Sequence, residues 1–150
     1  MNLHKVVQSQ YLASLGMLKQ VIVHCPEALW NAPGSQDEFW KKSYHTLFYA
    51  HLYLQNAEKD FVPWEKHREP DGGEPFTKDE VLAYLSFVEK QVIDRVPDTD
   101  LEAESGFHWL PFSKMELQFY NIRHIQQHTG ELYERLGTHE NVELHWVSSS

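Results

Sequence analysis

The sequence repeats one helix-start signal three times, and this repeat constrains the fold more than any other feature. In each copy a Ser or Thr stands three residues before a Glu: Ser35 and Glu38, Thr77 and Glu80, and Ser113 and Glu116. This is the capping-box pattern, in which the hydroxyl and the carboxylate satisfy N–H groups that the first turn of a helix leaves unpaired. Three copies in a chain of 150 residues predict a largely helical protein.

Apolar residues at helical spacing, together with the prolines, predict four long helices. Pro26 and Pro97 must end the first and the third, because proline cannot continue a helix. The expected helices are Leu3 to His24, Gln36 to about Asp60, Lys78 to Val96, and a last one that begins at Ser113 and that Gly137 can close as a C-cap. The residues expected to face inward are Val7, Tyr11, Leu15, Leu18 and Ile22 on the first helix and Val81, Leu85, Val88 and Val92 on the third.

A long irregular connection is expected between the second and third helices, where Pro63 and residues 70–73 (Pro-Asp-Gly-Gly) interrupt the pattern. Such a connection suits a crossover along a bundle better than a tight hairpin. The only strand-like alternation, at 142–147, is too short for a sheet. We therefore expect an all-α four-helix bundle, folded as a single domain over 1–150.

The net charge and the single cysteine limit the partners and the cellular compartment that we expect for this protein. A formal net charge of -9 repels phosphate backbones and anionic lipids, so neither nucleic acid nor a membrane is an expected partner. No apolar run approaches the roughly 20 residues that span a bilayer. The lone Cys25 excludes an internal disulfide and fits a buried, inert thiol in a reducing compartment, so we expect a cytoplasmic protein.

Two histidines in the last predicted helix point to a metal site. His124 and His128 are four residues apart, so a helix places both imidazoles on one face, one turn apart. Neutral imidazole is a common ligand of Zn, Ni, Cu and Fe. The pair lies on the same stripe as apolar residues, namely Leu117, Tyr120, Leu132 and Leu136. Such a pair is otherwise typical of two ordinary histidines, and as a metal site it needs a third ligand from another helix.

The second predicted helix offers two candidates for that ligand, His45 and His51. They are six residues apart and point about 120° away from each other, so both cannot easily face one ion. The surrounding segment is apolar nearly all round, and periodicity does not choose between them.

Three stretches of the chain resemble the DinB/YfiT-like family, and the order of elements matches over nearly the whole length. The stretches are Tyr44-His45-Thr46-Leu47-Phe48, residues 107–113 (Phe-His-Trp-Leu-Pro-Phe-Ser), and residues 120–132 (Tyr-Asn-Ile-Arg-His-Ile-Gln-Gln-His-Thr-Gly-Glu-Leu). The resemblance implies a four-helix bundle, often a homodimer, with a divalent metal held by one His of helix two and two of helix four. It thereby implies His45, His124 and His128 as ligands.

The chain departs from the family pattern at two positions. Gln127 stands where similar sequences have a histidine that is not expected to ligate, so the triad is intact. His51 stands where close relatives are expected to carry Asp, and it is a candidate for a fourth ligand, for a side chain that orients a ligand, or for a neutral replacement of the Asp. Other candidates for orienting a ligand are Tyr44, Asn121 and Glu131.

Three imidazoles leave coordination positions open, as in catalytic rather than structural metal sites. The expected function is thus a metal-dependent enzyme, with nickel or zinc as cofactor and a small molecule, such as a low-molecular-weight thiol, as substrate. The resemblance implies a thiol-dependent transferase or a hydrolase. No side chain is expected to be catalytic beyond water or a thiolate held at the metal. The alternative is a non-catalytic stress-response or ligand-binding bundle, in which the metal is structural or absent. An open pocket beside the histidines would favour chemistry, and a closed cluster packed by Phe48, Leu52 and Tyr120 would favour structure.

Overall fold

The protein is an all-helical bundle in the computed structural model, which describes residues 1–33, 37–140 and 143–150. Within these ranges there are five α-helices and no strand. The helices are α1 (Leu3–His24), α2 (Glu27–Trp30), α3 (Phe39–Tyr53), α4 (Lys78–Arg95) and α5 (Lys114–Glu140), with 3-10 turns at Glu58–Asp60 and Val96–Asp98. None of the helices in the described ranges has the length and apolar content needed to cross a membrane.

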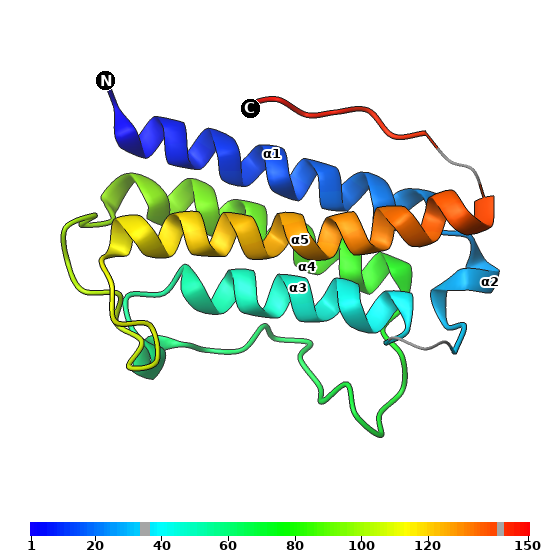
Figure 1. The fold of residues 1–150 in the computed structure, drawn as a ribbon. Coiled ribbons are helices and arrows are strands. Elements are labelled where there is room, and N and C mark those ends of the chain that lie inside the picture. Colours follow the sequence, from blue (N-terminus) through cyan, green and yellow to red (C-terminus); the bar gives the residue numbers. More distant parts are fainter. Residues whose placement is uncertain (34–36, 141–142) are drawn as a thin grey trace.

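The four long helices lie side by side (Figure 1). α5 packs against both α1 and α3, and α4 packs against the same two helices. The core lies between them, and every inward-facing residue predicted for the first and third helices is buried. The adjacency of α3 and α5 matters most for function, because these helices carry the candidate ligands.

Local signals explain three helix boundaries. α1 ends where predicted, just before Pro26, and the third predicted helix begins as α4 at Lys78. Thr77 and Glu80 form the complete capping box. The hydroxyl of Ser113 accepts a hydrogen bond from the Glu116 N–H at 3.2 Å.

The predicted start of the second helix, at Gln36 with its Ser35 capping signal, lies outside the described residues. Residues 37 and 38 are described and are not helical, so the prediction is wrong there and α3 begins at Phe39. Its predicted end near Asp60 is wrong, because α3 stops at Tyr53. After the helix the chain makes contacts outside α3: the Glu58 N–H donates to the Gly106 carbonyl at 3.2 Å, and the Lys114 ammonium donates to the carbonyls of residues 55 and 56.

Two other expectations differ from the structure. Gly137 does not close α5, which continues to Glu140. A glycine permits a helix to stop but does not force it, and no proline follows here. The short α2 was not expected; it begins after Pro26, and the Trp30 indole N–H donates to the Phe76 carbonyl at 2.9 Å.

The long connection between α3 and α4 is irregular, as predicted, and aromatic stacking fixes its path. Trp64 stacks on Tyr84 of α4, with ring centroids 4.6 Å apart. Phe76 stacks on Tyr44 of α3, with centroids 4.2 Å apart. These contacts hold the connection against α3 and α4 and bring His67 to the Tyr44 hydroxyl, which is hydrogen-bonded to His67 Nδ1.

Candidate metal centre

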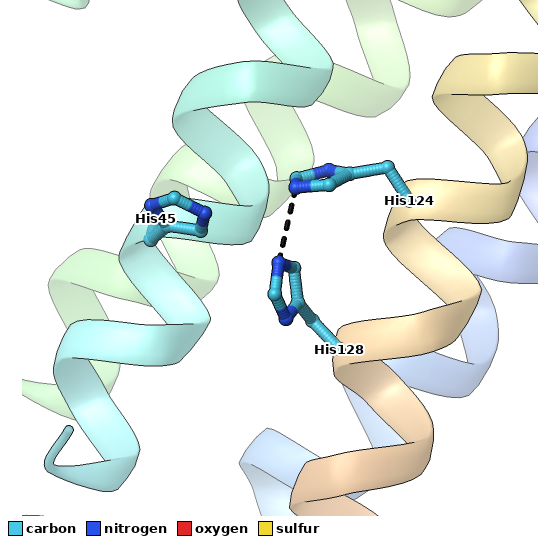
Figure 2. A group of neighbouring side chains, drawn as sticks. All are labelled: His45, His124 and His128. Carbon is cyan, nitrogen blue, oxygen red and sulfur yellow. Dashed lines mark hydrogen bonds between the residues drawn. The ribbon is translucent and has the colours of Figure 1, made fainter. Parts of the chain in front are cut away.

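The structure brings three of the predicted histidines together. His45 extends from α3, and His124 and His128 extend from neighbouring turns of α5 towards it (Figure 2). One ring nitrogen of each histidine lies within 4.8 Å of the corresponding atoms of the other two. Residues 79 to 83 positions apart in the sequence therefore meet because α3 and α5 pack against each other.

The spacing of the imidazole nitrogens fits a shared cation. The Nε2 atoms of His124 and His128 are 3.0 Å apart. Two nitrogens bound to one tetrahedral zinc, with bonds of about 2.0–2.1 Å, lie roughly 3.4 Å apart. The rings of His45 and His128 have centroids 5.1 Å apart, so a small rotation of the exposed His45 would bring it to the same ion. The donor set therefore suits a divalent metal, and its ligand role stays a prediction at this point.

The environment keeps the imidazoles of His124 and His45 in the neutral form that binds metals. Burial, together with the nearby imidazoles of His128 and His45, lowers the pKa of His124 to about 4. Burial and the neighbouring His128 also lower the pKa of His45. Both side chains are thus neutral at physiological pH, and a cation would not compete with a proton for them.

Glu131 contacts one of the three histidines directly. Its Oε1 lies 3.1 Å from His128 Nδ1, and its Oε2 forms an ion pair with Lys42 of α3. Burial alone would raise the pKa of the Glu131 carboxyl, but the hydrogen bond and charge of Lys42 and then those of His128 hold it below its usual value. By contrast, His124 Nδ1 is buried and has no hydrogen-bond partner in the described part of the chain.

An open cavity of about 380 Å³ lies beside His45. Its wall is aromatic, formed by Tyr44, Phe48 and Tyr49 of α3 with His67 of the connection, and its rim carries charged side chains. Of the three residues that would have marked a closed cluster, Phe48 lines this cavity. Leu52 and Tyr120 pack instead in a separate cluster with Tyr53 and Phe107.

His51 does not join the three histidines. It is 3% exposed, and its Nδ1 lies 2.9 Å from the Tyr84 hydroxyl of α4. The rings of Phe61 and Phe87 contact it at centroid distances of 4.9 and 5.0 Å. Burial lowers its pKa to about 4, so it is a neutral core imidazole on another side of α3.

The other two residues considered for orienting a ligand make different contacts. Tyr44 bonds His67, as described above, and the Asn121 side chain donates to the Ala50 carbonyl at 3.1 Å. Of the four candidates, only Glu131 touches one of the three histidines through a hydrogen bond in the described residues.

Sequence reasoning missed two residues at this site, Lys42 and His67. Lys42 precedes His45 by three residues, and this spacing placed it on the same helix face. This spacing was the available signal, but the adjacent Lys41 and Ser43 make the start of the helix look like an ordinary polar surface. His67 lies in the irregular connection, where periodicity says nothing about position.

Comparisons with known proteins do not extend this description. No protein-family model matches the chain, and neither the search of curated proteins nor that of solved structures found a match.

Proposed function

We propose that this protein binds a divalent metal ion through His45, His124 and His128 and uses it to act on a small molecule. The observation that carries the proposal is the convergence of three imidazoles from two helices, one of which, His45, lines an open, aromatic-walled cavity. Three imidazole ligands leave coordination positions free, which is typical of catalytic metal sites.

The same three residues are those implied by the resemblance to DinB/YfiT-like proteins, and the proposal includes membership of that family. Nickel and zinc suit an all-imidazole donor set, and both are proposed as the natural cofactor. A divalent ion of this kind supplies Lewis acidity and can hold a thiolate. The proposed reaction is therefore a thiol-dependent transfer or a hydrolysis.

The chain's own residues supply binding and orientation. Phe48 and Tyr49, which are partly exposed at the cavity, offer aromatic surface against which an apolar part of a substrate can pack. His67 is held at the cavity by the Tyr44 hydroxyl and by ring contact with Phe48 at 5.4 Å, and its Nε2 lies 3.5 Å from Glu69 Oε1. The open cavity favours chemistry over a purely structural metal.

Metal analysis of protein purified without an affinity tag or added metal tests the proposal. Inductively coupled plasma mass spectrometry should find about one nickel or zinc per chain, and His124→Ala should remove it. His108→Ala is the matched control, because the His108 side chain is 82% exposed and lies outside the cluster. Metal below about 0.2 per chain in the unaltered protein, or equal loading in His124→Ala, would contradict the proposal.

A further inference from the structure

Lys42, Glu131 and His128 form a continuous polar chain that joins α3 to α5. Lys42 lies three residues before His45, and Glu131 lies three residues after His128. The side chain of Lys42 is 10% exposed and that of Glu131 is 31% exposed, so the ion pair is largely shielded from water. A buried ion pair of this kind is weak support for stability alone, because desolvation offsets much of the attraction.

The donor and acceptor chemistry of the three groups determines where the proton on His128 lies. An ammonium group only donates hydrogen bonds, and an ionised carboxylate only accepts them. Glu131 accepts a hydrogen bond from Lys42 through Oε2, and its Oε1 lies against His128 Nδ1. Because Oε1 can only accept, a neutral His128 must carry its proton on Nδ1. Its Nε2 then presents a lone pair towards His124 and the centre of the cluster.

We propose that Lys42 and Glu131 are a positioning pair that fixes His128 in the tautomer competent to bind metal. Lys42 holds one carboxylate oxygen, which keeps the partly exposed Glu131 on the imidazole. The inference deepens the proposed function and rests on it for the identity of the bound group. The role of Glu131 follows a general pattern in metal sites, where a carboxylate orients a histidine ligand; the role of Lys42 is particular to this chain.

His124 lacks such support, and the contrast shows what the pair does. No hydrogen-bond partner among the described residues fixes its buried Nδ1. When His128 Nε2 is an acceptor, the proton of His124 lies on its own Nε2, which faces His128 at 3.0 Å. His128 can therefore ligate without a change of tautomer, whereas His124 must move its proton to Nδ1.

The substitution Glu131→Gln separates this role from that of a simple clamp between helices. The new amide has one accepting oxygen and one donating NH₂ group. Lys42 can only donate, so it takes the amide oxygen and leaves the NH₂ group facing His128 Nδ1. His128 must then accept at Nδ1 and carry its proton on Nε2, which is the tautomer that cannot bind metal.

Removing the lysine as well should reverse the defect. In Lys42→Met/Glu131→Gln the amide is free to turn its oxygen towards His128, and both tautomers become available. We expect Glu131→Gln to weaken Zn²⁺ binding by about 10- to 100-fold and the double variant to recover most of that loss. If the pair only clamped the two helices together, the double variant should bind Zn²⁺ no better than Glu131→Gln, because it has lost both halves of the ion pair.

Two measurements on the full chain test the inference. Nitrogen-15 NMR of the metal-free protein reads the tautomer of His128 directly: protonated Nδ1 in the unaltered protein, protonated Nε2 in Glu131→Gln. Competition with a chromophoric chelator gives the affinity for Zn²⁺ alone. Lys42→Arg should retain both properties. Lys41→Met is the control, because Lys41 pairs with Asp71 outside the chain of contacts.

Two results would overturn the inference: an unchanged His128 tautomer in Glu131→Gln, or a double variant that binds Zn²⁺ no better than Glu131→Gln. The NMR result does not depend on metal, so it stands even when the unaltered protein binds none. Failure of the metal proposal and failure of the positioning pair are therefore distinguishable.

Discussion

His45 and His51 lie on the same helix, α3, only six residues apart, yet the bundle puts them in opposite settings. His45 is exposed and meets two imidazoles of α5 beside a cavity. His51 is 3% exposed, bonds the Tyr84 hydroxyl and is surrounded by aromatic rings. Both are held neutral by burial or by their neighbours, so a lowered pKa does not distinguish a ligand from a core residue. What distinguishes them is which helix each one faces.

The largest expected difference between the two histidines is in metal binding. His45→Ala removes one of three ligands, so the metal content should fall from about one to below about 0.2 per chain. His51→Ala should keep its metal, because His51 lies outside the cluster. Metal analysis of the two purified variants makes the comparison, and equal loss in both would remove the distinction drawn here.

For the free energy of unfolding, the larger effect is expected from His51 and the smaller from His45. His51→Ala leaves a cavity among aromatic rings and deprives the Tyr84 hydroxyl of its partner, so we expect a loss of about 2–4 kcal/mol. His45→Ala alters an exposed side chain and should cost about 0.5 kcal/mol or less in metal-free protein. Urea unfolding monitored by circular dichroism measures both. A larger loss for His45→Ala would show that the core assignment of His51 is wrong.

The two settings also differ in their dependence on pH. The pKa of His51 is about 4 when folded and 6.5 in its unperturbed form, so between these values the unfolded state binds more protons. His51 therefore contributes stability at neutral pH that is lost as the pH falls from about 6.5 to about 4. His51→Leu should flatten this part of the stability curve of metal-free protein. Unfolding midpoints at several pH values give the slope, and an unchanged slope would mean that His51 is not held neutral.

The smallest expected effect comes from the hydroxyl that His51 contacts. Tyr84→Phe removes one buried hydrogen bond and should destabilise the protein by about 1 kcal/mol. Metal content should not change, since Tyr84 touches none of the three clustered histidines through a hydrogen bond in the described residues. Thermal unfolding together with metal analysis checks both parts. A loss of metal in Tyr84→Phe would indicate that the two sides of α3 are coupled.

The sequence predicted those parts of the fold that short-range signals control. The Thr77 capping box, the stop at Pro26 and the buried faces of α1 and α4 all depend on residues within a few positions of one another. The early end of α3 could not be predicted in this way. It is accompanied by contacts with distant residues: Lys114, nearly 60 residues further along the chain, donates to the carbonyls of residues 55 and 56, and the Glu58 N–H donates to the Gly106 carbonyl.

The candidate site shows the same division. Helical spacing alone paired His124 with His128, but it could not choose between His45 and His51 in a segment that is apolar on every side. That choice depends on the rotation of α3 against α5, which is a property of packing. Family resemblance pointed to His45, and the structure places it beside the other two histidines. The position of His67 could not be predicted from the sequence, because aromatic stacking along an irregular connection determines it.

A crystal structure of the metal-loaded protein, with anomalous diffraction measured on both sides of the nickel and zinc absorption edges, tests the central claim most directly. The account predicts one strong anomalous peak within about 2.0–2.3 Å of a ring nitrogen of each of His45, His124 and His128. A peak bonded to His51, or full metal content with no peak among these three histidines, would contradict it.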